Sequence, residues 1–74
     1  MKKVAVLLAD GFEEVEAITP VDFLRRAGIE VVLTSLGELS VTGSHNVVIL
    51  ADTTLDALGD DLDGIILPGG MPGS

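Results

Sequence analysis

Three short apolar runs, each long enough for one buried β-strand, constrain the fold of this chain more than any other feature. They lie around Val4, Val31 and Ile65 and are rich in valine, leucine and isoleucine. Such runs are typical of parallel strands buried on both faces, and a sheet of that kind needs helices on both sides. The sequence predicts only one substantial helix. We therefore expect an α/β fold with a mainly parallel sheet whose helical layers are incomplete in this chain.

The first half of the chain is predicted to form a β-α-β unit. Strands are expected at residues 3–9 and 29–34, with a helix from about residue 14 to residue 27 between them. Arg25 and Arg26 lie in the last helical turn, where positive charge suits the helix dipole. The helix is followed by Gly28, a residue type that commonly ends helices.

The remaining signals are less regular. Pro20 removes the hydrogen bond to the carbonyl group of Glu16, so we expect either a kink or a helix that restarts at Pro20. Residues 52–58 are expected to form a turn, or one or two helical turns capped by Thr53 or Thr54. Further strands are expected at residues 39–42, 47–51 and 64–67.

Composition excludes several classes of function. The chain has 74 residues, with 12 acidic and 4 basic side chains and a net charge of −8, which disfavours nucleic acids and anionic membranes as partners. No stretch approaches transmembrane length, and the apolar run after Lys3 is too short for a secretory signal, so we expect a cytoplasmic protein. The absence of cysteine excludes a disulfide or a thiolate metal site within the chain.

Glu16 is the candidate acid or base. It follows the first strand in the segment A-D-G-F-E-E-V-E-A and falls in the first turn of the predicted helix. In open α/β sheets, ligands and catalytic groups collect at the carboxyl edge of the strands, where this segment lies. Apolar neighbours predict a half-buried carboxyl group that could donate or accept a proton. The simpler interpretation, which suffices for Glu13 and Glu14, is an acidic side chain that complements the helix dipole.

The second candidate is the P-G-G segment after the last strand. Gly69 and Gly70 would allow the backbone to approach a ligand and to present consecutive N–H groups to an oxyanion. An ordinary tight turn is the simpler interpretation. Because this segment and Glu16 both follow parallel strands, we expect them to lie at the same edge of the sheet. The glycine patterns of phosphate-binding loops are absent, so a phosphate site of those types is not expected here.

His45 is the only histidine in the sequence, and it falls in a polar turn. With no second histidine and no cysteine, we expect an exposed side chain and no metal site. No serine or threonine lies in a strand-to-helix elbow of the G-x-S-x-G type. The chain therefore offers an acid or base and an oxyanion site, but no nucleophile.

Three segments together resemble the N-terminal part of the DJ-1/PfpI (ThiJ) superfamily, most closely its DJ-1/YajL branch. They are V-A-V-L-L-A-D-G-F-E-E-V-E-A-I-T-P-V-D-F-L-R-R-A-G, V-T-G-S-H-N-V-V-I and D-G-I-I-L-P-G-G-M-P-G. The resemblance extends over essentially the whole chain but covers less than half of such a domain. It implies a flavodoxin-like, class I glutamine-amidotransferase-like three-layer sandwich. Residues 1–74 would be the N-terminal part of one such domain, completed by a C-terminal segment.

The resemblance also implies the roles of individual residues. A glutamate placed as Glu16 is hydrogen-bonded to a reactive cysteine on a nucleophile elbow, and glycines placed as Gly69 and Gly70 form the oxyanion hole. The cysteine and its histidine partner would lie beyond Ser74. Such proteins are usually homodimers, with residues of the first helix, here including Arg26, near the contact.

Three functions remain open at this stage. The first is a cysteine-dependent enzyme that acts on small reactive carbonyls, as a glyoxalase III or a protein deglycase, without a metal or an organic cofactor. The second is a redox-responsive chaperone or stress sensor that uses the same cysteine. The third is a structural fragment that pairs with a complementary piece. In none of them is the chain expected to be active alone.

Overall fold

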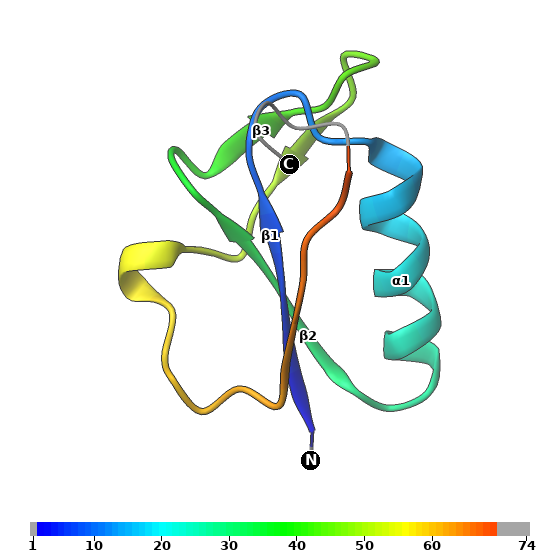
Figure 1. Ribbon diagram of the computed structural model, residues 1–74, viewed down its shortest axis with the longest axis vertical. Helices are drawn as coiled ribbons and strands as arrows, with labels where there is room; N and C mark the ends of the chain where they lie inside the picture. The colour runs from blue at the N-terminus through cyan, green and yellow to red at the C-terminus, as the bar shows by residue number, and fades with distance from the viewer. Residues whose placement is uncertain (1, 70–74) are drawn as a thin grey trace.

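The computed structural model describes residues 2–69, which form a parallel sheet, a small separate hairpin and one long helix (Figure 1). The α/β class with a mainly parallel sheet is as the sequence predicts. The elements in chain order are β1 (Lys3–Leu8), α1 (Glu14–Arg26), β2 (Glu30–Ser35), β3 (Ser40–Thr42), β4 (Val48–Leu50), β5 (Thr53–Thr54), the 3-10 turn η1 (Leu55–Ala57) and β6 (Gly64–Ile66).

The main sheet has the strand order β5-β2-β1-β6, and all of its pairs are parallel. Val6 in the central strand β1 pairs with Leu33 of β2 on one side and with Ile66 of β6 on the other. The carboxyl ends of β1 and β6 therefore lie side by side. This edge carries the segments that follow both strands.

Helix α1 runs without interruption through Pro20, so the prediction of a helix that restarts there is wrong. Its last turn ends as predicted, because Gly28 has a φ of +83°, a conformation that glycine adopts without steric cost. The N–H of Ile29 then donates to the carbonyl oxygen of Leu24 at 3.0 Å. This arrangement turns the chain directly into β2.

The core lies between α1 and one face of the main sheet. It is formed by alternate residues of the strands, together with Ala17 and Val21 of α1 and with Phe12 from the loop before α1. Phe12 is the largest fully buried side chain of the described part. The opposite face of β6 is open, with Ile65 58 % exposed, so the expected burial of this strand on both faces is wrong for this chain. Among residues 2–69, α1 is the single α-helix, and it covers one face.

The strands β3 and β4 form an antiparallel pair, and the turn between them includes Asn46 at a φ of 66°. Both strands fall within their predicted ranges. The expectation for residues 52–58 is corrected in part, because Thr53 and Thr54 form the short edge strand β5 beside β2. Thr54 precedes η1 but makes no capping hydrogen bond with its side chain. Within residues 2–69, no helix combines the length and the apolar character needed to span a membrane.

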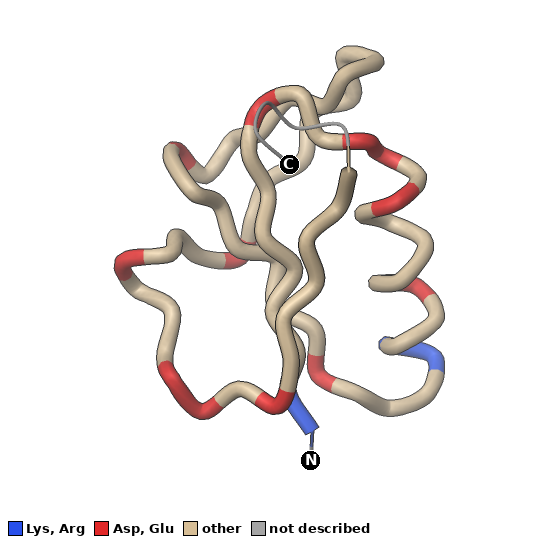
Figure 2. The backbone as a smooth tube through the Cα atoms, in the orientation of Figure 1, with Lys and Arg blue, Asp and Glu red and all other residues tan. Residues whose placement is uncertain are grey.

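The charged residues are arranged unevenly along the strands (Figure 2). Lys and Arg lie near the N-terminus and at the last turn of α1, which are both at the amino ends of the strands. Among residues 2–69, the opposite edge, where β1 ends and α1 begins, carries acidic residues and neither Lys nor Arg. The carboxyl edge of the sheet is therefore a region of negative charge.

Candidate functional site

Glu16 and Gly69 meet at the carboxyl edge of the main sheet, as the sequence predicts. The loop after β1 leads into α1 and places Glu16 in the first helical turn. Gly69 follows β6, which is the parallel neighbour of β1, after the buried Pro68. The order of the strands therefore brings together two residues that lie 53 positions apart.

Both polar groups of the Gly69 backbone contact the start of α1. Its N–H donates to Oε1 of Glu16 at 2.8 Å, and its carbonyl oxygen accepts from the N–H of Glu13, also at 2.8 Å. A Cβ atom at position 69 would lie 2.6 Å from the same Glu16 oxygen. Only glycine allows the carboxylate to approach in this way.

The environment of Glu16 differs from the expectation. The side chain is exposed rather than half-buried, although its carboxylate accepts from the Gly69 N–H. The Gly69 N–H is occupied by the carboxylate, so it can serve an oxyanion only if Glu16 gives up this hydrogen bond. Gly70, the second glycine of the predicted oxyanion site, lies outside the described residues.

A second cluster joins the start of α1 to the β3–β4 turn. Oε2 of Glu14 accepts from the backbone N–H groups of His45 at 2.7 Å and of Val47 at 3.3 Å, and its Oε1 lies 2.9 Å from Nδ1 of His45. Oε1 of Glu13 lies 3.3 Å from the same ring nitrogen. The hydroxyl group of Ser44 donates to Glu13 at 3.3 Å or to Glu14 at 3.4 Å.

These contacts change the pKa values of Glu14 and His45. Desolvation opposes the ionisation of Glu14, but hydrogen bonds from the His45 ring, from its own N–H and from the N–H groups of His45 and Val47 lower its pKa to about 2. The pKa of His45 is raised, because its ring bonds to Glu14 and lies near the negative charges of Glu14 and Glu13. The Glu14 side chain is 13 % exposed, whereas that of His45 is 73 % exposed as predicted.

The sequence interpretation missed this cluster. From the sequence, only a second histidine or a cysteine counts as a metal-binding partner for His45. The fold instead supplies two carboxylates from about thirty positions away. No periodicity or spacing signals a contact between a helix start and a distant turn. Nearby, hydrogen bonds from the Gly11 N–H to the Thr42 carbonyl, and from the Thr42 N–H to Oδ1 of Asp10, join the loop before α1 to the end of β3.

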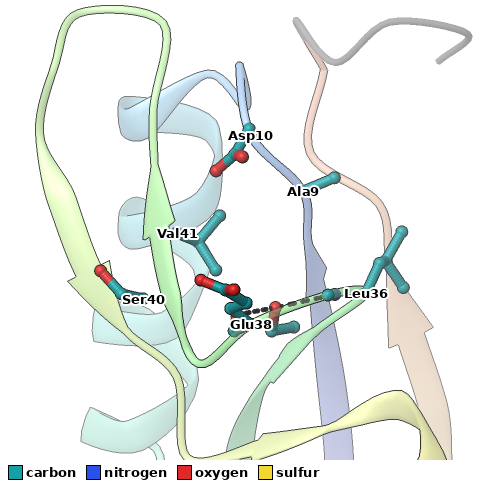
Figure 3. A pocket seen from close by; sticks show the side chains of 8 residues that line it. Ala9, Asp10, Leu36, Glu38, Ser40 and Val41 are labelled. Carbon is teal, nitrogen blue, oxygen red and sulfur yellow. Dashed lines mark hydrogen bonds between the residues drawn. The ribbon is translucent and has the colours of Figure 1, made fainter.

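A pocket of about 290 Å³ lies at the same edge, beyond the ends of β1 and β2 (Figure 3). Glu16 and Gly69 do not line it. Ser35 is one of its lining residues, and its hydroxyl donates to the Glu38 carbonyl and accepts from the Gly37 N–H. The lining residues are Ala9, Asp10, Ser35, Leu36, Gly37, Glu38, Ser40 and Val41.

The fold and the paired Glu16 and Gly69 define an α/β domain with an acidic residue and a glycine amide at the carboxyl edge of a parallel sheet. The sequence profile of the DJ-1/PfpI family matches residues 2–74, and the chain belongs to that family. It is 47 % identical to the protein dj-1beta of Drosophila melanogaster over 99 % of this chain and 40 % of that protein. It is 38 % identical to a deglycase of Thermococcus kodakarensis over 92 % of this chain and 42 % of that protein.

Comparison with solved structures agrees with this family assignment. Toxoplasma gondii DJ-1 in its oxidized form superposes with a TM-score of 0.93 and 42 % identity, over 97 % of this chain and 40 % of that structure. The chain therefore spans about two fifths of the length of these relatives. The described part reproduces the fold of the corresponding part of a DJ-1 domain.

Proposed function

We propose that residues 1–74 are the N-terminal part of a single DJ-1/PfpI-like domain, and that a complementary C-terminal segment completes it. The complete domain is this chain together with that segment. The uncovered face of β6 supports the proposal, because a buried parallel strand needs cover on both sides. Intact mass spectrometry of the purified protein tests the idea. A single 7.6 kDa species without a companion would contradict it.

The function proposed for the complete domain is cysteine-dependent hydrolysis of reactive carbonyls, of the glyoxalase III or protein deglycase type. One observation carries the proposal: the Glu16 carboxylate and the Gly69 N–H meet at 2.8 Å beside the carboxyl ends of two parallel strands. This pair offers a group that can carry a proton and an N–H that can donate a hydrogen bond to an oxyanion, at one point. The name of the Thermococcus relative as a deglycase supports the same class of substrate.

The chemistry follows from these groups. A thiolate from the complementary segment attacks the carbonyl carbon of an aldehyde or glycated adduct; a C–S bond forms, and the C=O π electrons move to the oxygen. The Gly69 and Gly70 amides stabilise that oxyanion. Glu16 takes the proton of the thiol and gives it to the oxyanion, so the first product is a hemithioacetal, and the protonated Glu16 releases the Gly69 N–H for the substrate. In a methylglyoxal adduct, a proton then moves from the carbon that bears the sulfur to the neighbouring carbonyl carbon, which gives a thioester. Water cleaves the C–S bond of this thioester, and the acid and the free thiol are released. These steps need neither a metal nor an organic cofactor.

The replacement of Glu16 by glutamine in the complete domain tests this role. We expect Glu16→Gln to lose most turnover of methylglyoxal-type substrates, because the amide keeps the size of the side chain but carries no exchangeable acid proton. Glu30→Gln is the matched control, since Glu30 is exposed at the amino end of β2, away from the site. Full activity of Glu16→Gln would contradict the proposal.

A redox-responsive chaperone or stress sensor is the second candidate. The description of the Toxoplasma gondii structure as oxidized favours it, because it shows that a relative can be isolated in an oxidised state. Suppression of client aggregation by a cysteine-free complete domain would indicate a chaperone role independent of redox chemistry. If the cysteine-free domain lost both the suppression of aggregation and the turnover of carbonyl substrates, both activities would be assigned to the thiol.

We also propose that the complete domain forms a homodimer through the first-helix region. Val15, Ile18, Asp22 and Arg26 follow one another at helical spacing, and the two apolar members are 66 % and 38 % exposed. The Arg26 guanidinium at the end of this stripe forms an exposed ion pair with the Asp22 carboxylate at 3.1 Å. Light scattering of the complete domain tests the association.

A further inference from the structure

Four side chains from two distant segments direct polar atoms at one point. Glu13 and Glu14 come from the start of α1, and Ser44 and His45 come from the β3–β4 turn. The proposed catalytic chemistry uses none of these side chains. Glu13, Glu14 and His45 each bring one atom suited to a metal ion into a group within 4.8 Å.

Five of the six distances among four polar atoms of this cluster lie between 2.9 and 3.4 Å. Nδ1 of His45 lies 2.9 Å from Glu14 Oε1, 3.3 Å from Glu13 Oε1 and 3.1 Å from Ser44 Oγ. Ser44 Oγ lies 3.3 Å from Glu13 Oε1 and 3.4 Å from Glu14 Oε1. Four ligands about 2.0–2.1 Å from a zinc ion are separated by about 3.3–3.4 Å. These five separations are close to those around a tetrahedral zinc ion, and ligand atoms of Glu13, Glu14 and His45 all lie within 4.8 Å of one another.

The chemistry of the donors favours a borderline divalent ion. One imidazole nitrogen and two carboxylate oxygens are ligands that zinc accepts, whereas calcium and magnesium prefer oxygen donors throughout. In the described part of the chain, the surrounding edge of the sheet has acidic residues and no Lys or Arg (Figure 2), which favours a cation. The fourth position, beside Ser44, is open to the hydroxyl group or to water.

Contacts behind the cluster already fix its most buried ligand. The N–H groups of His45 and Val47 hold Oε2 of Glu14 and leave Oε1 directed at the histidine ring. Such outer contacts are the usual means by which proteins orient metal ligands. Gly43 contributes space, because a Cβ atom there would overlap the Glu14 carboxylate. His45 is 73 % exposed, so an ion can enter from solvent.

From this arrangement we infer that Glu13, Glu14 and His45 form a zinc site that joins the start of α1 to the β3–β4 turn. Bound zinc would replace the hydrogen bonds among these side chains with coordinate bonds. It would hold the turn against the helix that carries Glu16. The inference rests on residues of this chain alone and does not depend on the proposed enzyme activity.

Isothermal titration calorimetry tests the site. Zinc chloride is titrated into the metal-free protein that carries this chain. We expect saturation at one ion per chain, and a loss of affinity of at least about tenfold in both His45→Ala and Glu13→Gln, since even outer contacts of metal sites contribute that much. Asp60→Asn, at an exposed acid in the loop before β6, is the control and should bind zinc as the parent does. Any zinc held by a thiol elsewhere in the protein would be additional to this ion and would be unchanged in both cluster variants.

Cobalt provides a second measurement, because tetrahedral Co²⁺ absorbs visible light far more strongly than octahedral Co²⁺. We expect an intense visible band in the parent and in Asp60→Asn, and its loss in His45→Ala. Circular dichroism checks that both cluster variants keep their fold, since His45 is exposed and Glu13 is half-buried. Zinc affinity unchanged by His45→Ala and Glu13→Gln, or no saturable zinc binding in the parent, would overturn the inference.

Discussion

The backbone N–H of Gly69 donates a 2.8 Å hydrogen bond to the carboxylate of Glu16, and this bond joins the end of β6 to the first turn of α1. The carbonyl group of the same glycine accepts from Glu13. One residue therefore sets the position of the segment after β6 relative to the helix start. The proposed chemistry requires this bond to open, so its strength should influence the turnover rate more than the stability of the fold.

Replacement of Gly69 by alanine should displace the Glu16 carboxylate. The new Cβ atom would lie 2.6 Å from Glu16 Oε1, the mobile end of a flexible exposed side chain. In the complete domain we expect kcat/KM for methylglyoxal to fall by roughly 10- to 100-fold, because a displaced acid or base loses part of its contribution. Gly37→Ala is the control, since nothing lies within 4 Å of a Cβ atom there. Equal activity in the two variants would show that the approach of Glu16 to position 69 is unimportant.

The two phenylalanines should respond very differently to truncation. Phe12 is fully buried in the loop between β1 and α1, whereas Phe23 is 66 % exposed on α1. Phe12→Ala should lower the free energy of unfolding by about 3–5 kcal/mol, because it leaves a cavity beside the sheet. Phe23→Ala should change it by less than about 1 kcal/mol. Urea unfolding of the protein that carries this chain measures both, and similar losses would contradict the placement of Phe12 in the core.

The interface proposed on α1 predicts a change of assembly. Val15→Asp would place a charge on the exposed apolar part of the stripe that includes Ile18 and Arg26, and burying that charge is costly. The complete domain should then shift from dimer to monomer in light scattering at micromolar concentration. Val15→Thr is the matched control, because it keeps the volume of the side chain without adding charge. An unchanged mass for Val15→Asp would exclude this helix face from the contact.

Much of the fold could be predicted because its signals are local. The β-branched runs predicted β1 and β2 to within one or two residues, and Gly28 marked the end of α1. The short edge strand β5 was missed, since Thr53 and Thr54 carry no apolar pattern and are defined only by their pairing with Thr34 and Ser35. The exposure of Ile65 and Glu16 could not be predicted either, because it depends on which other segments cover them.

At the carboxyl edge of the sheet, one contact could be predicted from the sequence and the other could not. The meeting of Glu16 and Gly69 was predictable, because two parallel strands that pair must end at the same edge. The contact of Glu14 with His45 was not, since the β3–β4 turn reaches the helix start through its own geometry. Glu14 looked like an ordinary helix-dipole residue in the sequence. In the structure it is the main link between helix and turn.

This link should make the stability of the fold depend on pH. The folded-state pKa of Glu14, about 2, lies below its ordinary value of 4.5, so the carboxylate stabilises the fold above about pH 4.5 and loses that contribution as the pH falls toward 2. The raised pKa of His45 acts in the opposite direction: its contribution is complete below 6.5 and is lost as the pH rises through the folded-state value. Glu14→Gln should therefore destabilise the protein most near pH 5–6, where both groups are charged in the parent. In urea unfolding with a chelator present, the difference from the parent should shrink as the pH falls to about 2.5. A difference that stays constant over this range would show that the Glu14 charge contributes nothing to the hold on the turn.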